Sequence, residues 1–214
     1  SKSGTDNFVN SSLRTIKELI HADLVKARPE LGFYYVEESL SKPIIPDNDN
    51  CFIVTPISGI KNYSKGLSYF ATSIALLNKN NVLASVIYDP IKDEMFYSEK
   101  GKGAFINNSR IRVSSNKNIA NSVFVFERAG LIQGIIDKTI LADNNNIRVL
   151  GSNCLDLVNT ASGRIDGYFS DKLDEVKLSA GLLILREAGG IKIDLNNSNS
   201  SLITNNLLAE IFKG

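Results

Sequence analysis

The stretch Cys51–Tyr63, CFIVTPISGIKNY, is a place where residue types and spacing could do chemistry. A hydrophobic strand, Cys51–Val54, leads into a tight turn at Pro56–Gly59, and such a strand end presents backbone groups and short side chains to a ligand. Metal-assisted chemistry there would need acids, because hard cations such as Mg²⁺ bind oxygen ligands and favour carboxylates. Thr55 and Ser58 supply only hydroxyl groups. The stretch therefore has the outline of a metal site without its acids.

Two acids and one lysine elsewhere could serve a site of this kind. Glu37 and Glu38 lie in a predicted turn, where they are either a ligand pair or plain surface acids. Lys177 lies at the start of a predicted helix, where its ammonium group and the free backbone amides would favour an anion. A structural ion pair is the alternative for Lys177.

Gly151, Ser152 and Asn153 form a further candidate at a predicted strand-to-helix turn. Their backbone and hydroxyl groups could hold a polyol or a phosphate. The same residues are also explained by Ser152 acting as the N-cap of the helix. Glu127 and Arg128 follow another predicted strand, and we expect them to form a solvated pair.

Composition limits the classes of function. The 214 residues are 43% hydrophobic and 22% charged with a formal net charge of +1, which predicts no broad nucleic-acid surface. Cys51 and Cys154 lie in apolar segments without metal-ligand spacing, which favours buried, reduced cysteines. The longest apolar runs, such as residues 181–185, are too short to cross a membrane, and no signal peptide is visible. We therefore expect a cytoplasmic protein that does not enter the membrane.

Hydrophobic periodicity predicts the elements that would position these residues. Helices are expected at 11–27, 130–143, 155–163 and 177–190, and a strand or helix at 208–214. Strands are expected at 32–39, 51–54, 67–77, 81–90, 94–100, 103–114, 122–127, 147–153, 165–170 and 191–194. Residues 1–115 thus form a helix and an antiparallel sheet, residues 116–214 alternate strand and helix, and the two halves make one compact α+β or α/β unit.

Six stretches match ordered motifs of a known family. They are KSGTDNFVNSSL (2–13), EES (37–39), TPISGIKNY (55–63), YDPIKDEMFYSEKGKGAFINNSRIRVS (88–114), GSNCLDLVNTASGRIDGYF (151–169) and VKLSAGLLILREAGGIKID (176–194). Together they resemble the inositol monophosphatase family of magnesium-dependent, lithium-sensitive sugar-phosphate phosphatases, over nearly the whole chain. The resemblance implies a layered αβαβα sugar-phosphatase fold.

The resemblance also implies a set of site positions. Two Mg²⁺ ions flank the phosphate in that family, one activating water and the other stabilising the leaving oxygen. Carried over by position, Glu37 and Ile57 are remnants of the metal site, and we expect no bound cofactor. Departures from the family pattern are Leu13, Thr55, Ser58 and Lys177 at aspartate positions, Ile60 at the water-orienting threonine and Ser170 at the glutamate that contacts inositol. The implied substrate or anion positions are Gly59, Ile60, Gly151, Ser152, Asn153, Ser170 and Lys177.

These departures predict a non-catalytic homologue that is kept for binding or regulation, with Lys177 paired to Glu37 in place of a metal ion. Two alternatives stay open. One is a magnesium-dependent phosphatase of inositol monophosphate or a related sugar phosphate, with metals held by Glu37, Glu38, the Ile57 carbonyl and waters. The other is an anion or sugar-phosphate sensor with Lys177 in the receptor. The resemblance further implies a homodimer and, from the bacterial extragenic-suppressor branch, a protein partner in the RNA and transcription machinery.

Overall fold

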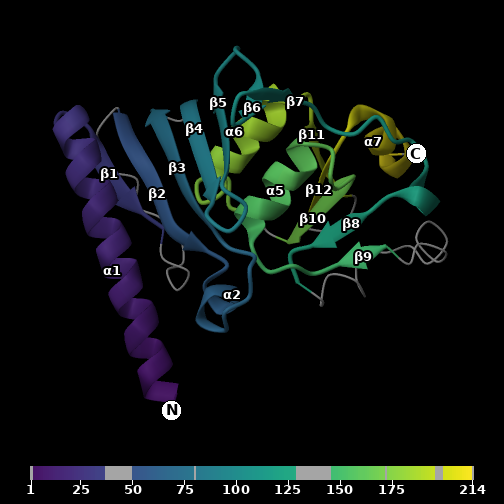
Figure 1. The fold of residues 1–214 in the computed structure, drawn as a ribbon. Coiled ribbons are helices and arrows are strands. Elements are labelled where there is room, and N and C mark those ends of the chain that lie inside the picture. The colour runs from purple at the N-terminus through teal and green to yellow at the C-terminus, as the bar shows by residue number, and fades with distance from the viewer. Residues whose placement is uncertain are drawn as a thin grey trace.

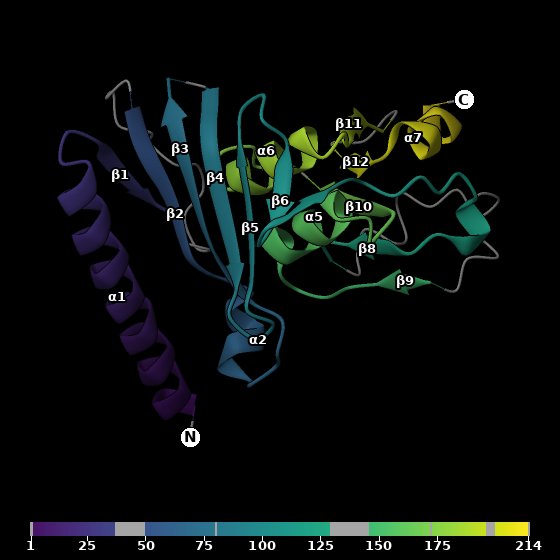
Figure 2. The same cartoon turned by 45° about the horizontal axis from the view of Figure 1, so that its top comes forward.

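The computed structural model describes residues 2–36, 50–79, 81–128, 146–171, 173–195 and 200–213. Helices and sheets follow one another as layers (Figure 1): α1, the first sheet, the central helices α5 and α6, the second sheet and α7. A second view keeps the same order, with α1 along the first sheet and α7 at the far side of the molecule (Figure 2). This layered mixture of helices and two sheets is the fold class that the sequence predicts.

The outer helix α1 (Lys2–Ala27) is 26 residues long and packs on the face of the first sheet that is turned away from the central helices. Its residues Ile20 and Leu24 pack against a buried cluster. The cluster consists of Leu31, which follows α1, and of Phe52 and Val54 in strand β2 (Asn50–Ser58). In the described part of the chain, no helix combines the length and the apolar character needed to cross a membrane.

The first sheet has the strand order β1-β2-β3-β4-β5-β6-β7 among the described residues. Its members besides β2 are β1 (Gly32–Tyr35), β3 (Ala71–Asn78), β4 (Asn81–Asp89), β5 (Glu94–Glu99), β6 (Ala104–Ile106) and β7 (Ser109–Ile111). β1 runs parallel to β2, and the following pairs are antiparallel. Alternate residues of β3 are buried, so one side of the strand contributes to the central core.

The central layer consists of α5 (Asn153–Ala161) and α6 (Ser179–Glu187), which pack on each other. Leu157 and Ile184 are fully buried, in a core that also takes Ile87 from the first sheet and Tyr168 from the second. One hydrophobic core therefore joins both sheets, and it fixes the loops that enter α5 and α6.

The second sheet has the order β11-β12-β10-β8-β9. Its strands are β8 (Phe124–Phe126), β9 (Ile147–Arg148), β10 (Gly167–Asp171), β11 (Ile191–Asp194) and β12 (Ser200–Thr204), and a short 3₁₀ turn, η1 (Ile119–Asn121), precedes β8. The last helix, α7 (Asn206–Lys213), covers this sheet, with Phe212 edge-on to Phe124 and Phe169. β8 runs parallel to β10, so the residues after these two strands emerge at the same edge of the sheet.

Several predicted boundaries were wrong. The first helix begins at Lys2 rather than at residue 11, and residues 103–114 form the hairpin β6–β7 rather than a single strand. The hairpin turns at Asn107, which takes a positive φ of 49°. The short helix α2 (Ile60–Ser64) and strand β12 were not predicted, and the C-terminal segment is helical. The helix expected at 130–143 lies outside the described residues.

Candidate functional site

A cavity of about 330 Å³ lies at the end of β2, where segments distant in sequence meet. Its lining residues among those described are Val36, Thr55, Ser58, Glu127, Asn153, Cys154, Lys177 and Leu178. The structure thus places Thr55, Ser58, Asn153 and Lys177, all singled out in the sequence, around one space.

The end of β2 is irregular, which sets the direction of its two hydroxyl residues. Thr55 pairs with Ser73 and Ser58 with Ala71, so the register of β2 against β3 shifts between Thr55 and Ser58. The Thr72 hydroxyl donates to the Pro56 carbonyl at 2.8 Å across this irregularity. Such bulges redirect side chains at strand ends, and here both Thr55 and Ser58 line the cavity while Ile57 is buried in the core.

Two glycines allow the loops beside the cavity to approach each other. Gly59 has a φ of +89°, and a Cβ there would lie 2.9 Å from the Tyr69 carbonyl oxygen and 3.0 Å from the Ser152 Cβ. Gly151 has a φ of +84° and faces the Asn62 side chain. Asn62 donates to the carbonyls of Tyr69 and Leu150, each at 2.8 Å, and so ties the loop after β2 to the loop before α5.

Ser58 and Ser152 bond to each other beneath this contact. Their hydroxyl oxygens are 3.1 Å apart, and the Ser152 hydroxyl also lies 3.1 Å from the Ser58 carbonyl oxygen. The Cys154 backbone amide donates to the Ser58 hydroxyl at 3.3 Å. Ser152 occupies the N-cap position of α5, but its side chain makes no capping bond. The two serines therefore fix the strand end to the helix start.

Glu127 forms one wall of the cavity, although the sequence suggested only a solvated pair with Arg128. Its carboxylate accepts hydrogen bonds from the Asn153 side-chain amide at 3.1 Å, the Ser170 hydroxyl at 2.8 Å and the Asp171 backbone amide at 3.0 Å. Arg128 instead pairs with Asp171. No signal in the sequence indicated this role, because it depends on the parallel pairing of β8 and β10, which places Glu127 and Ser170 at the same sheet edge.

Lys177 reaches the cavity from the turn that precedes α6, because the helix begins at Ser179. The expectation of free amides beside Lys177 was wrong: the backbone amides of Val176 and Lys177 both donate to the Asp174 carboxylate at 3.1 Å. The Lys177 Nζ lies 3.8 Å from an oxygen of the same carboxylate. An anion here would meet the ammonium group but also the charge of Asp174.

A second carboxylate, Asp156 of α5, is completely buried. Burial raises its pKa to about 7, assisted by the charge of Glu127 and opposed by the hydrogen bond that the Tyr69 hydroxyl donates at 2.7 Å. Its Oδ2 has no hydrogen-bond partner among the described residues. Burial and the neighbouring Asp156 raise the pKa of Tyr69 in turn. This pair was not singled out in the sequence.

The remaining predicted positions lie outside the described lining of the cavity. Leu13 is on α1, Ile60 begins α2, and Ser170 is buried with its hydroxyl turned to Glu127. Gly59, Gly151 and Ser152 support the loops as described above. Glu37 and Glu38 lie outside the described residues, and so does the expected pairing of Glu37 with Lys177.

The described lining does not fit a Mg²⁺ site. It supplies one carboxylate, whose two oxygens already accept hydrogen bonds, together with the hydroxyls of Thr55 and Ser58 and one ammonium group. Magnesium needs several oxygen ligands in near-octahedral geometry, usually including carboxylates. Over the described ranges, no three His, Cys, Asp or Glu side chains gather as metal ligands would.

Comparison with known proteins identifies the class to which this fold and cavity belong. Residues 1–211 match the family model described as "Inositol monophosphatase family". The chain belongs to the inositol monophosphatase family, whose members are generally magnesium-dependent.

Individual relatives support the assignment. An inositol-1-monophosphatase of Mesorhizobium japonicum is 34% identical over 212 residues, which cover 96% of this chain and 79% of that protein. A protein named Nus factor SuhB, from Pasteurella multocida, is 37% identical over 211 residues, covering 96% and 78%. The crystal structure of the extragenic suppressor protein SuhB from Bartonella henselae matches with a TM-score of 0.80 at 34% identity, covering 94% of this chain and 81% of that one. The Thermotoga maritima inositol monophosphatase matches with a TM-score of 0.80 at 28% identity, covering 93% and 79%.

Proposed function

We propose that this protein is a non-catalytic member of the inositol monophosphatase family, which uses its cavity for binding or regulation rather than for hydrolysis of phosphate esters. The observation that carries the proposal is the joint presence of Thr55, Ser58 and Lys177 around one cavity, where the family resemblance implies aspartates. Leu13, at another of these aspartate positions, lies on α1 outside the described lining. Two-metal hydrolysis depends on carboxylates that hold the ions against the phosphate.

The charge of Lys177 opposes a divalent ion in the cavity. At about 4 Å and an effective dielectric constant near 20, two like unit charges repel by about 4 kcal/mol. A tenfold loss of affinity requires only about 1.4 kcal/mol. Asp174 offsets part of this repulsion from 3.8 Å, but both of its oxygens already face Lys177 or the backbone amides.

Release of phosphate from inositol 1-phosphate, with and without Mg²⁺, tests the proposal directly. We expect that Mg²⁺ does not increase the release of phosphate by the wild-type protein. The variant Thr55→Asp/Ser58→Asp/Lys177→Asp should gain Mg²⁺ binding in isothermal titration calorimetry. The matched variant Thr55→Asn/Ser58→Asn/Lys177→Asn should not, because it removes the lysine charge and changes the same positions without adding carboxylates.

Magnesium-dependent turnover by the wild-type protein would contradict the proposal. It would favour the alternative of a weak or unconventional phosphatase whose metals are held by Glu37, Glu38, the Ile57 carbonyl and waters. The melting temperature of each variant, measured without metal, serves as the control for folding.

A sugar-phosphate sensor is a second candidate, favoured by the position of Lys177 and Asn153 on the walls of the same cavity. Inositol 1-phosphate should then raise the melting temperature without Mg²⁺, and Lys177→Gln should abolish the rise. The acids Glu127 and Asp174 beside the cavity weigh against a strongly charged anion.

Partners follow only from relatives and family resemblance. The name Nus factor carried by the Pasteurella relative supports a protein partner in the transcription machinery, and family resemblance supports a homodimer. Sedimentation velocity of the purified chain tests the dimer. Co-sedimentation with RNA polymerase tests the partner.

A further inference from the structure

A second cavity, of about 260 Å³, lies between α6, the adjoining ends of β3 and β4, and the turn that joins β5 to β6. Its lining is Leu77, Asn81, Val82, Lys100, Glu175, Val176, Ser179, Leu182, Leu183 and Arg186. Leu77 and Leu183 are buried, and Val82, Val176 and Leu182 pack against the central core. The cavity therefore combines an apolar floor with charged groups from the β5–β6 turn (Lys100), the turn before α6 (Glu175) and α6 itself (Arg186).

The charges around this cavity leave a positive excess. Its acidic member, Glu175, is paired with Lys192 at 2.9 Å. The neighbouring acid Glu99 is paired with Lys102 at 2.7 Å. Lys100 donates to Asn81 at 3.3 Å. Among the described residues, the acids beside the Lys100 ammonium group and the Arg186 guanidinium are Glu99 and Glu175, which already have partners.

Glu187, the acid that follows Arg186, is engaged with the backbone. It accepts from the amides of Gly101 and Gly103, each at 2.8 Å, and so ties the β5–β6 turn to the end of α6. This contact holds Lys100, which directly precedes Gly101, close to the end of α6 that carries Arg186. The two cations are thus positioned by the fold and do not depend on each other.

Ser179 provides an independent sign of a ligand. It is 3% exposed, it lines the cavity, and its hydroxyl has no hydrogen-bond partner among the described residues. A buried hydroxyl without a partner loses its bonds to water and gains none in return, so buried polar groups in folded proteins are nearly always satisfied. A polar ligand group in the cavity would give this hydroxyl its partner.

We propose that this cavity binds a small organic anion with an apolar body and one carboxylate or phosphate group. The anionic group would meet Lys100 and Arg186, and the body would cover the leucine and valine floor. Guanidinium groups suit both headgroups because they donate two parallel hydrogen bonds. At roughly 30 Å³ per water molecule, 260 Å³ corresponds to about nine waters, which limits the ligand to a single ring or a short branched chain.

This site is separate from the candidate functional site. Val176 and Ser179 line the second cavity, while Lys177 and Leu178 line the first. The proposal therefore holds whether or not the protein hydrolyses phosphate esters.

Three probes of similar body and different headgroup test the proposal: benzoate, phenyl phosphate and the neutral benzamide. Each is titrated into the ¹⁵N-labelled full chain and followed by amide chemical shifts. We expect benzoate or phenyl phosphate to shift Asn81, Val176 and Ser179 most, and benzamide to bind at least about tenfold more weakly. The stronger of the two anions identifies the headgroup.

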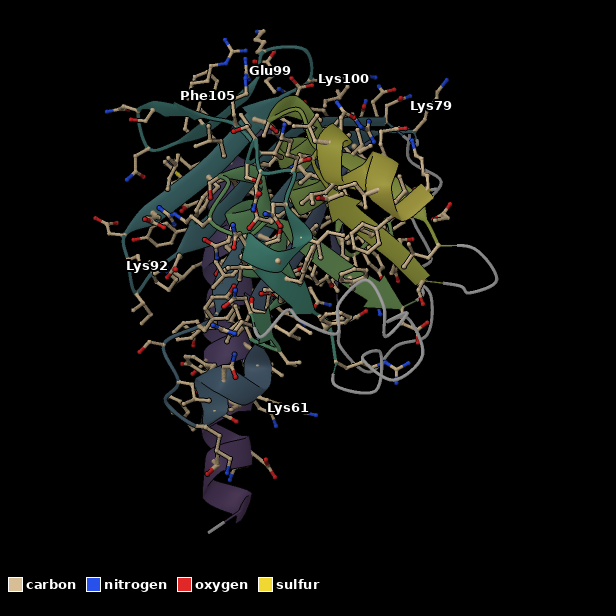
Figure 3. All side chains as sticks on the ribbon, turned by 90° about the vertical axis from the view of Figure 1, so that its right-hand side faces the viewer. Lys61, Lys79, Lys92, Glu99, Lys100 and Phe105 are labelled. Atoms are coloured by element: carbon tan, nitrogen blue, oxygen red, sulfur yellow. The ribbon has the colours of Figure 1, made fainter. Side chains whose placement is uncertain are left out.

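Variants separate this site from general attraction to a charged surface. Arg186→Gln should weaken binding of the anion by about tenfold or more. Lys61→Gln removes the same charge from α2, far from Lys100 (Figure 3), and should leave the affinity within about twofold. Ser179→Ala should weaken binding while the melting temperature of the free protein stays level or rises, since the substitution removes an unsatisfied hydroxyl.

The proposal is overturned if benzamide binds as well as benzoate, or if neither anion shifts these amides at millimolar concentration. It is also overturned if Arg186→Gln and Lys61→Gln have equal effects. The unbound spectrum of each variant, compared with that of the wild type, verifies the fold.

Discussion

Two carboxylates near the candidate site have very different surroundings. Asp156 and Glu127 are both acids near the candidate site, yet Glu127 accepts hydrogen bonds from three groups while one oxygen of Asp156 has no partner among the described residues. Complete burial disfavours the ionised form of Asp156 and, with the charge of Glu127, raises its pKa to about 7.

The raised pKa of Asp156 makes stability depend on pH. Between its ordinary value of 3.8 and about 7, folded Asp156 holds a proton that the unfolded chain releases, so the free energy of unfolding falls as pH rises through this window and then levels. Asp156→Asn should remove this slope. Between pH 5 and pH 8 its free energy of unfolding should exceed that of the wild type by about 2–4 kcal/mol. Urea unfolding at several pH values measures it.

Asp194 offers the matched control for this measurement. The Ser201 hydroxyl, and then Lys192, lower the pKa of its exposed carboxylate, so it is ionised in both states above pH 5. Asp194→Asn should leave the slope between pH 5 and pH 8 unchanged. An unchanged slope in Asp156→Asn as well would show that Asp156 titrates normally.

Sequence motifs indicated Thr55, Ser58, Asn153 and Lys177 as candidate site residues, and all four line one cavity in the structure. Glu127 was missed because its importance depends on strand pairing: only the parallel alignment of β8 with β10 brings it beside Ser170. The prediction of free backbone amides beside Lys177 was wrong, because a single upstream residue, Asp174, accepts their hydrogen bonds. Such local bonds are a matter of turn geometry, which hydrophobic periodicity does not report.

At the scale of elements, tertiary contacts determine the helix boundaries where the hydrophobic periodicity of the sequence is weak. Residues 2–10 are mostly polar and carry no helical stripe, yet α1 extends through them. Phe8 stacks on Tyr63 of α2 with ring centroids 5.6 Å apart, and the Tyr63 hydroxyl donates to Ser12 at 2.8 Å. Long periodic segments such as 177–190 were recognised because their buried face repeats, although α6 begins two residues later.

The loop after β2 should tolerate no side chain at Gly59. Gly59→Ala forces a Cβ to within 2.9 Å of the Tyr69 carbonyl oxygen at a positive φ, and we expect a loss of about 2–4 kcal/mol in the free energy of unfolding. Gly66→Ala is the matched control, because Gly66 also has a positive φ, of +71°, but no atom within 4 Å of the added Cβ. Equal losses in the two variants, measured by urea unfolding, would mean that the Gly59 contact contributes nothing.

At the scale of the whole molecule, the sequence indicated layers, and both sheets indeed share one core through α5 and α6. What it did not supply was the pairing of short strands: β12 was absent from the prediction, although it lies between β10 and β11. Short strands are specified by their neighbours more than by their own residues.

The shared core predicts that residues 1–115 and 116–214 unfold together. Leu157→Ala should leave a cavity costing about 2–5 kcal/mol, lowering the melting temperature by roughly 5–15 °C without splitting the transition. Calorimetry, together with far- and near-ultraviolet circular dichroism, measures this. Two separate transitions in the wild type would contradict it.

The turn at residues 174–178 is shared by two spaces, because its successive residues line one cavity and then the other. If the ligands of both cavities favour different positions of this turn or the same one, each alters the affinity of the other, and thermodynamic reciprocity requires effects of equal size in the two directions. Occupancy of the two cavities would then be cooperative, positively or negatively, with no motion beyond this one turn. Under such coupling, an affinity measured at either cavity depends on the concentration of the ligand that fills the other.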